Sequence, residues 1–298
     1  MAETWKIEAP EQLALGEGVR RLRLHAVGGR INVLGVDGPA ALEVSRISGP
    51  PLTVELADGE LLVRHGEESF RTGLLSWLTR GARQEVELSV SVPPDALVEV
   101  TVVSGPVVLS NLHERVTLKG ASGELTLAGM YGPTAVSTVS GAVTVEQATD
   151  DLSVRAVSGA ITVLAGSGGK IDLNTVAGAI TLDLEEPLPS QVKTTCVSGG
   201  LTVRLPHDPD VEVALTSTSG QATSQFAEVT ASRKPGSSRL SGRVGTGRTR
   251  LTGHTVSGAI TVLRRDPDED PLEDEHPGTG STGSTGSTGN DEGIEDAR

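Results

Sequence analysis

Hydrophobic and polar residues alternate in short runs through the first third of the chain, from about residue 5 to residue 100. A period of two places successive side chains on opposite faces of a strand, so each run predicts a half-buried β-strand. Turn-forming pairs such as Gly28-Gly29 and Asp58-Gly59 separate the runs. The runs cover residues 19–25, 31–34, 42–44, 52–56, 61–63 and 86–92.

One segment of this region has a different spacing. Residues 70–83 contain Leu74, Leu75, Trp77 and Leu78, which fall on one face of a short helix with arginines around it. We interpret this apolar stripe as packing on the N-terminal strands. The alternative is a mobile apolar loop that contacts a partner or the surface of a membrane.

A seven-residue phrase then returns along the chain. Val-Ser-Gly-Ala-Val-Thr-Val at residues 139–145 has close copies further on and weaker copies before it. Its glycine recurs at intervals of 18, 18, 18, 19, 21, 21 and then 38 residues, and a repeat of this length predicts stacked coils. The glycines are Gly105, Gly123, Gly141, Gly159, Gly178, Gly199, Gly220 and Gly258.

Alignment of the copies on this glycine predicts which positions face the core. Aliphatic residues, with occasional threonines, recur seven and five residues before the glycine and two and four after it, so these positions are expected to point inward. We expect the aliphatic residues of the phrase to form the core, with only its threonine facing water. Two short strands joined at each Ser-Gly corner then stack into a parallel β-solenoid. The outward threonines are Thr126, Thr144, Thr162, Thr181, Thr202 and Thr261.

These patterns divide the chain into three parts. Residues 1–97 are expected to form an N-terminal strand-rich cap, residues 98–265 an all-β solenoid of 18–21-residue coils, and residues 266–298 a disordered acidic tail. An irregular stretch before the last copy is expected to hold a degenerate coil around residues 240–244.

Composition narrows the range of partners. The tail holds 11 acidic residues and one arginine, a charge of -10, whereas the remaining 28 acidic and 24 basic residues give only -4. Nothing in this balance favours a nucleic acid. The chain shows neither a signal-peptide pattern nor an 18-residue apolar stretch, so we expect no transmembrane segment and a cytoplasmic location.

Few residues are candidates for chemistry. Cys196 is the only cysteine, and its column of small residues predicts a structural role. The six histidines share no metal-ligand spacing. Asp150-Asp151 resembles a carboxylate pair, but we expect a solvated turn there, and residues 166–172 also predict a turn rather than a calcium or phosphate loop. The sequence therefore assigns no catalytic, cofactor-binding or metal-binding residue.

The repeated phrase, the lead-in at residues 90–94 and the strand at residues 28–33 resemble the bacterial "putative adhesin" domain of unknown function, over about residues 7–263. The resemblance implies an adhesin-like β-solenoid without established catalytic residues, and it implies a link to envelope stress. Some members of that family have an N-terminal membrane anchor, and we expect this chain to lack one.

We therefore expect a non-catalytic scaffold or binding module for a macromolecular partner, protein or glycan, with no cofactor. The alternative is a carbohydrate-binding or carbohydrate-active protein that uses the outward threonine strip. Threonine is also simply a good polar strand residue, so the strip alone leaves both interpretations open. The oligomeric state stays open as well.

Overall fold

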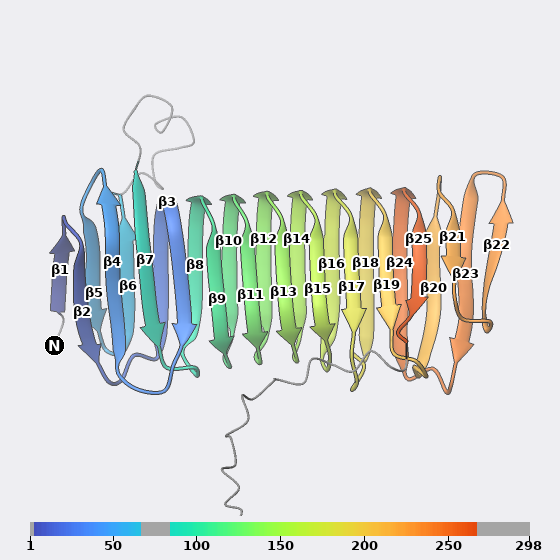
Figure 1. Ribbon diagram of the computed structural model, residues 1–298, viewed down its shortest axis with the longest axis horizontal. Coiled ribbons are helices and arrows are strands. Elements are labelled where there is room, and N and C mark those ends of the chain that lie inside the picture. Colours follow the sequence, from blue (N-terminus) through green and yellow to red (C-terminus); the bar gives the residue numbers. More distant parts are fainter. Residues whose placement is uncertain (1–2, 67–83, 267–298) are drawn as a thin grey trace, which may run out of the picture. The chain divides into compact units, whose positions relative to one another are not determined.

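The computed structural model describes residues 3–66 and 84–266. Within these ranges the chain forms 25 strands and no helix, as the alternating pattern predicts. The strand pairings fall into two sheets, here called sheet A and sheet B, and in Figure 1 the strands follow one another along one axis. The predicted all-β solenoid is therefore confirmed.

Each central coil contributes one strand to each sheet. Equivalent strands of successive coils pair in parallel and without offset, so that Val143 lies beside Ile161 and Ile161 beside Ile180. Parallel pairing here needs no crossover helix, because each coil returns to its starting point through the opposite sheet. The central strands of sheet A are β8 (Leu97–Ser104), β10 (Val116–Ser122), β12 (Thr134–Ser140), β14 (Leu152–Ser158), β16 (Lys170–Ala177) and β18 (Gln191–Ser198); those of sheet B are β9 (Val107–Leu112), β11 (Leu125–Met130), β13 (Val143–Ala148), β15 (Ile161–Gly166), β17 (Ile180–Leu184) and β19 (Leu201–Leu205).

The N-terminal end begins with a coil made from one long strand. The first half of β3 (Arg21–Gly35) pairs with β8 in sheet A, and its second half pairs with β9 in sheet B. On its other side β3 pairs with β6 and β7, and antiparallel strands follow outward in both sheets. β3 thus pairs with strands on both sides of residue 97, where the sequence predicts the boundary between cap and solenoid. That boundary stays a prediction. These outer strands are β1 (Glu3–Ile7), β2 (Glu11–Gly16), β4 (Ala40–Ser48), β5 (Leu52–Ala57), β6 (Glu60–His65) and β7 (Glu85–Val92).

The C-terminal end departs from chain order. β24 (Thr249–Ser257) and β25 (Ile260–Arg264) stack directly on β18 and β19. The preceding coil, β20 (Val211–Ser217) and β21 (Ala222–Ser224), lies outside them. Because β21 has three residues, it covers only part of β25, whereas β25 covers β19 over five paired residues. The short coil therefore ends the stack.

The prediction of a degenerate coil around residues 240–244 is wrong. These residues belong to β23 (Ser237–Val244), which pairs antiparallel with β20 and with β22 (Val229–Lys234). The hairpin of β22 and β23 closes the end of sheet A. Antiparallel strands thus cover the N-terminal end of the stack in both sheets and its C-terminal end in sheet A, which limits further pairing at these edges.

The predicted inward columns form the core. Val136, Val154 and Ile161 represent them, with exposed fractions of 0–1%. Phe226 is the only phenylalanine among the described residues and packs in the same cluster near the C-terminal end. Aliphatic side chains fill nearly all of the space between the two sheets, as the scarcity of aromatic residues predicts.

The corner glycines stack into a ladder. A Cβ built on Gly141 would overlap the carbonyl oxygen of Gly123, and one on Gly159 would overlap that of Gly141. The backbone of Gly141 also has a φ of 129°, which L-residues rarely adopt. Close stacking of the coils therefore requires glycine at this corner. In stacking order the ladder is Gly29, Gly105, Gly123, Gly141, Gly159, Gly178, Gly199, Gly258 and Gly220.

A second left-handed position recurs near the end of the sheet B strands. Asn111, Gly129, Gln147 and Ala165 align there, and all have φ values between 53° and 67°. Only one of them is glycine, so the sequence gives no obvious sign of this bend. The amide Nδ2 of Asn111 donates to the carbonyl oxygen of Gly35 at 2.7 Å, which holds the bend against the neighbouring coil.

Candidate functional site

The outward threonines form a continuous ladder on sheet B. Thr144 lies beside Thr126 and Thr162, and the register continues through Thr181, Thr202 and Thr261. Thr223 extends the row at the C-terminal end because β21 pairs with β25. The predicted strip is thus one straight row on the outer face of sheet B, while its proposed ligand stays a prediction.

A second row of outward side chains lies on sheet A and was not foreseen. The valine that opens each Val-Ser-Gly phrase is solvent-exposed, with exposed fractions of 38–56%. The expectation that every aliphatic residue of the phrase is core is therefore wrong. The row consists of Val103, Val139, Val157, Val176, Val197 and Val256, with Ala121 in the coil between the first two.

Strand alternation explains this valine row. Ala156 precedes Val157 and is buried, as Cys196 precedes Val197 and is buried. Because neighbouring strand residues face opposite sides, the residue after each inward position must point outward. The same alternation could have been applied to the sequence, but the hydrophobic character of valine suggested a buried position instead.

Uncharged residues follow the exposed valines at the corner between the two sheets. Between Val157 and Thr162 lie the Ser-Gly corner, an exposed alanine and one buried isoleucine, and the coils at residues 139–144, 176–181, 197–202 and 256–261 are equally free of charge. We call these five uncharged segments the corner strip. A protein in which 21% of residues are charged thus presents a neutral, partly apolar line across five stacked coils. Such a line is a candidate contact surface.

A shallow hollow lies on the outer face of sheet A, beside the start of strands β10 to β16. It has a volume of about 350 Å³. Its floor is formed by the small residues Thr117, Ala135 and Ser153, which lie side by side in the register. Arg115 and Lys170 line it together with Pro133, Asp151 and Asp172.

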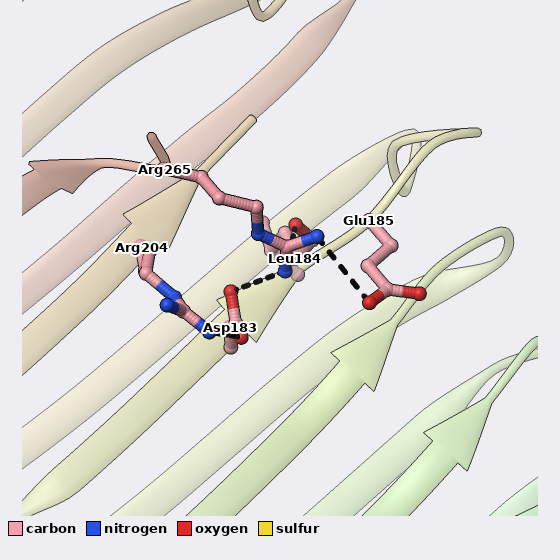
Figure 2. A network of polar contacts seen from close by, with 5 residues as sticks. All are labelled: Asp183, Leu184, Glu185, Arg204 and Arg265. Carbon is pink, nitrogen blue, oxygen red and sulfur yellow. Dashed lines mark hydrogen bonds and ion pairs between the residues drawn. The ribbon is translucent and has the colours of Figure 1, made fainter. Parts of the chain in front are cut away.

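Ionic contacts tie the inserted C-terminal coil to the stack, as Figure 2 shows. Arg265 donates to Asp183 at 2.8 Å and pairs with Glu185 at 3.3 Å, while Arg204 donates to the other oxygen of Asp183 at 2.5 Å. Burial alone would raise the pKa of Asp183, but the two arginines outweigh it and hold the pKa below 3.8. The carboxylate therefore stays ionised, and the cluster has the properties of a structural clamp rather than of a proton-transfer site.

The family model for Toastrack DUF4097 matches residues 44–263. The chain belongs to the Toastrack DUF4097 family. No curated protein matches the sequence.

Two crystal structures are similar to this Toastrack chain over most of its length. One, a "putative adhesin" from Bacteroides fragilis, has 12% identity, covers 88% of this chain and 96% of its own, and has a TM-score of 0.45. The other, a "putative cell adhesion protein" from Clostridium sporogenes, has 14% identity, covers 86% of this chain and 100% of its own, and has a TM-score of 0.26. At these values neither structure says what the Toastrack chain binds.

The other candidate residues of this Toastrack chain show no arrangement for catalysis. Burial raises the pKa of the Cys196 thiol, which keeps it protonated. Asp150 and Asp151 lie in a turn, where the backbone N–H of Lys170 donates to Asp151 at 2.8 Å, and residues 167–169 also form a turn. Among residues 3–66 and 84–266, no three His, Cys, Asp or Glu side chains gather to hold a metal ion.

Two predictions concern the membrane. The apolar stripe of Leu74, Leu75, Trp77 and Leu78 lies outside the described residues, so its role as cap core or contact surface stays a prediction. In the part of the chain that the structure describes, no helix is long and apolar enough to cross a membrane.

Proposed function

We propose that this protein is a non-catalytic binding module whose solenoid offers the corner strip to a macromolecular partner. The single observation that carries the proposal is the row of six exposed valines in register on one edge of the stack. An exposed valine leaves apolar surface in contact with water, which is unfavourable unless a partner covers that surface in the functional state. A rigid stack also holds the row straight, so a partner does not have to order it.

A charge-insertion experiment tests this proposal. Val157→Lys with Val176→Lys places two charges in the centre of the corner strip without touching the core. Ala231→Lys with Ser232→Lys adds the same charge on β22, where both residues are exposed. A partner captured by the wild type and by the β22 control, but lost with the valine variant, is the expected result. Equal capture by all three proteins, or capture by none, would contradict the proposal.

Carbohydrate binding through the threonine ladder is the second candidate function. It is supported by the unbroken register of Thr126 to Thr261, which repeats one hydroxyl and one methyl group per coil. Binding on a glycan array that disappears with Thr162→Lys and Thr181→Lys would support it. An absence of binding on a broad glycan array would exclude this second function.

A link to envelope stress and a cytoplasmic location remain proposals. The first is supported only by sequence resemblance, and nothing in the described structure bears on the second.

A further inference from the structure

Six basic side chains project from the outer face of sheet A between β10 and β24 and have no ionic partner among the described residues. By contrast, arginines near the two ends of the sheet are paired, as Arg23 is with Glu99 and Arg243 with Glu212. The net charge of -14 already favours solubility, so solubility does not explain why these cations are unpaired. The six are Arg115, Lys119, Arg155, Lys170, Lys193 and Arg250.

Two of these cations border the hollow. Arg115 precedes β10 and Lys170 begins β16, so three coil steps separate them, a distance of about 14 Å at the usual strand spacing of about 4.8 Å. The small side chains of Thr117, Ala135 and Ser153 lie between them. The hollow is therefore a trough along the stacking axis with one cation near each end.

The two carboxylates in the trough already have partners. An oxygen of Asp151 accepts from the backbone N–H of Lys170 at 2.8 Å, and an oxygen of Asp172 accepts from the side-chain amide of Asn174 at 2.9 Å. The guanidinium of Arg115 and the ammonium of Lys170 have none in the described chain. The trough thus combines two cations without a partner among the described residues, two carboxylates that each accept one hydrogen bond, and the hydroxyls of Thr117 and Ser153.

An exposed aromatic ring lies in the turn that leads into the trough. Tyr131 is 45% exposed and comes two residues before Pro133, which lines the trough. The ring of His113 meets Tyr131 edge to face with ring centres 4.9 Å apart, which restricts its orientation. A sugar ring offers an apolar face to such a side chain and hydroxyls to the neighbouring polar groups.

We propose that this trough, lined by Arg115, Thr117, Ala135, Ser153 and Lys170, binds a linear acidic glycan. Carboxylates of the glycan pair with Arg115 and Lys170, its hydroxyls bond to Thr117 and Ser153, and one ring packs near Tyr131. A nucleic acid fits less well, because single strands need successive aromatic platforms, whereas the rings of Tyr131 and His113 meet edge to face at one place beside the trough. The site lies on the sheet opposite the threonine ladder and is independent of the corner strip.

Binding of a hexameric oligogalacturonate to the full chain tests the proposal, with its methyl-esterified form as the uncharged control. Calorimetry is expected to show binding of the acidic form only, weakening as salt rises to about 0.5 M. Arg115→Gln with Lys170→Gln should weaken binding at least about tenfold. Arg233→Gln with Lys234→Gln, which removes the same charge from exposed positions on β22, should change it less than about twofold.

A second variant separates the trough from diffuse charge attraction. Ala135 is exposed, so Ala135→Tyr fills the trough without altering charge or core and should also weaken binding at least about tenfold. Circular dichroism and an unchanged melting temperature establish that each variant is folded. Val157→Lys with Val176→Lys should bind the oligosaccharide as the wild type does.

Three results would overturn the proposal. Equal binding of the esterified sugar would show that its charge is not recognised. Binding that survives both Ala135→Tyr and the Arg115 and Lys170 changes would place the ligand elsewhere. Binding to phosphatidylglycerol vesicles without binding to the oligogalacturonate would identify a lipid surface instead.

Discussion

Arg265 reaches along the stack to Asp183, and their 2.8 Å contact joins the residue that follows the last strand to a strand two positions away in sheet B. β25 stacks on β19, and β19 stacks on β17, which carries Asp183. The contact therefore fastens the inserted coil to the coils that precede it in the stack. Both side chains are largely buried, with exposed fractions of 13% and 9%.

Arg265→Ala should lower the free energy of unfolding by about 2 kcal/mol, because it removes charged hydrogen bonds and leaves Asp183 with Arg204 alone. Chemical denaturation measures the change. Arg243→Ala, which breaks an ion pair whose arginine is 58% exposed, should cost less than about 1 kcal/mol. Equal effects of the two substitutions would argue against the clamp.

Acid should destabilise the protein below neutral pH through His65. Its ring is buried, and burial lowers its pKa below 6.5, although neighbouring carbonyl groups of Pro50 and Ser48 act in the opposite direction. The unfolded chain then takes up a proton at a higher pH than the folded one, so stability is lost as pH falls below about 6.5.

Denaturation midpoints measured from pH 7.5 to pH 5.5 check the effect of His65. His65→Gln should flatten the decline, with the remaining slope attributed mainly to His25, whose pKa burial also lowers. An unchanged slope in this variant would exclude His65 as a source.

Gly141→Ala should destabilise the stack by at least about 3 kcal/mol, because the new Cβ meets the carbonyl oxygen of Gly123. Gly38→Ala is a matched control: its φ of 130° is nearly that of Gly141, but a Cβ there has nothing within 4 Å. Backbone strain alone should cost that control about 1–2 kcal/mol. Thermal unfolding of both variants separates the close approach from the strain.

Ile161→Asp should prevent stable folding, since an unpaired charge in the aliphatic core costs several kcal/mol. Thr162→Asp places the same group one residue further along the strand, on the outer face, where the cost should be below about 1 kcal/mol. Far-ultraviolet circular dichroism and melting temperature compare the two. Similar melting temperatures would contradict the inward and outward assignment.

Much of the candidate surface could be predicted because strand alternation is local. The position of Thr162 between two inward residues follows from period two alone, and the ladder of threonines follows from the repeat length. The valine row follows from the same rule, yet hydrophobicity suggested the opposite for Val157. The repeat places Arg115 and Lys170 in one column, but the hollow between them could not be predicted, because its shape depends on how the side chains of successive coils pack.

The sequence by itself determined the all-β class, the two-strand coil, the corner glycine and the inward columns, because each depends on residues within one repeat. Tertiary structure decided which coils are neighbours. The last coil lies between β18 and β19 on one side and the coil before it, β20 and β21, on the other, since the five residues of β25 pair with β19 over a longer stretch than the three of β21 could. Arg265 and Asp183 meet only because of that order. Long-range pairing has no period along the chain, so no local pattern records it.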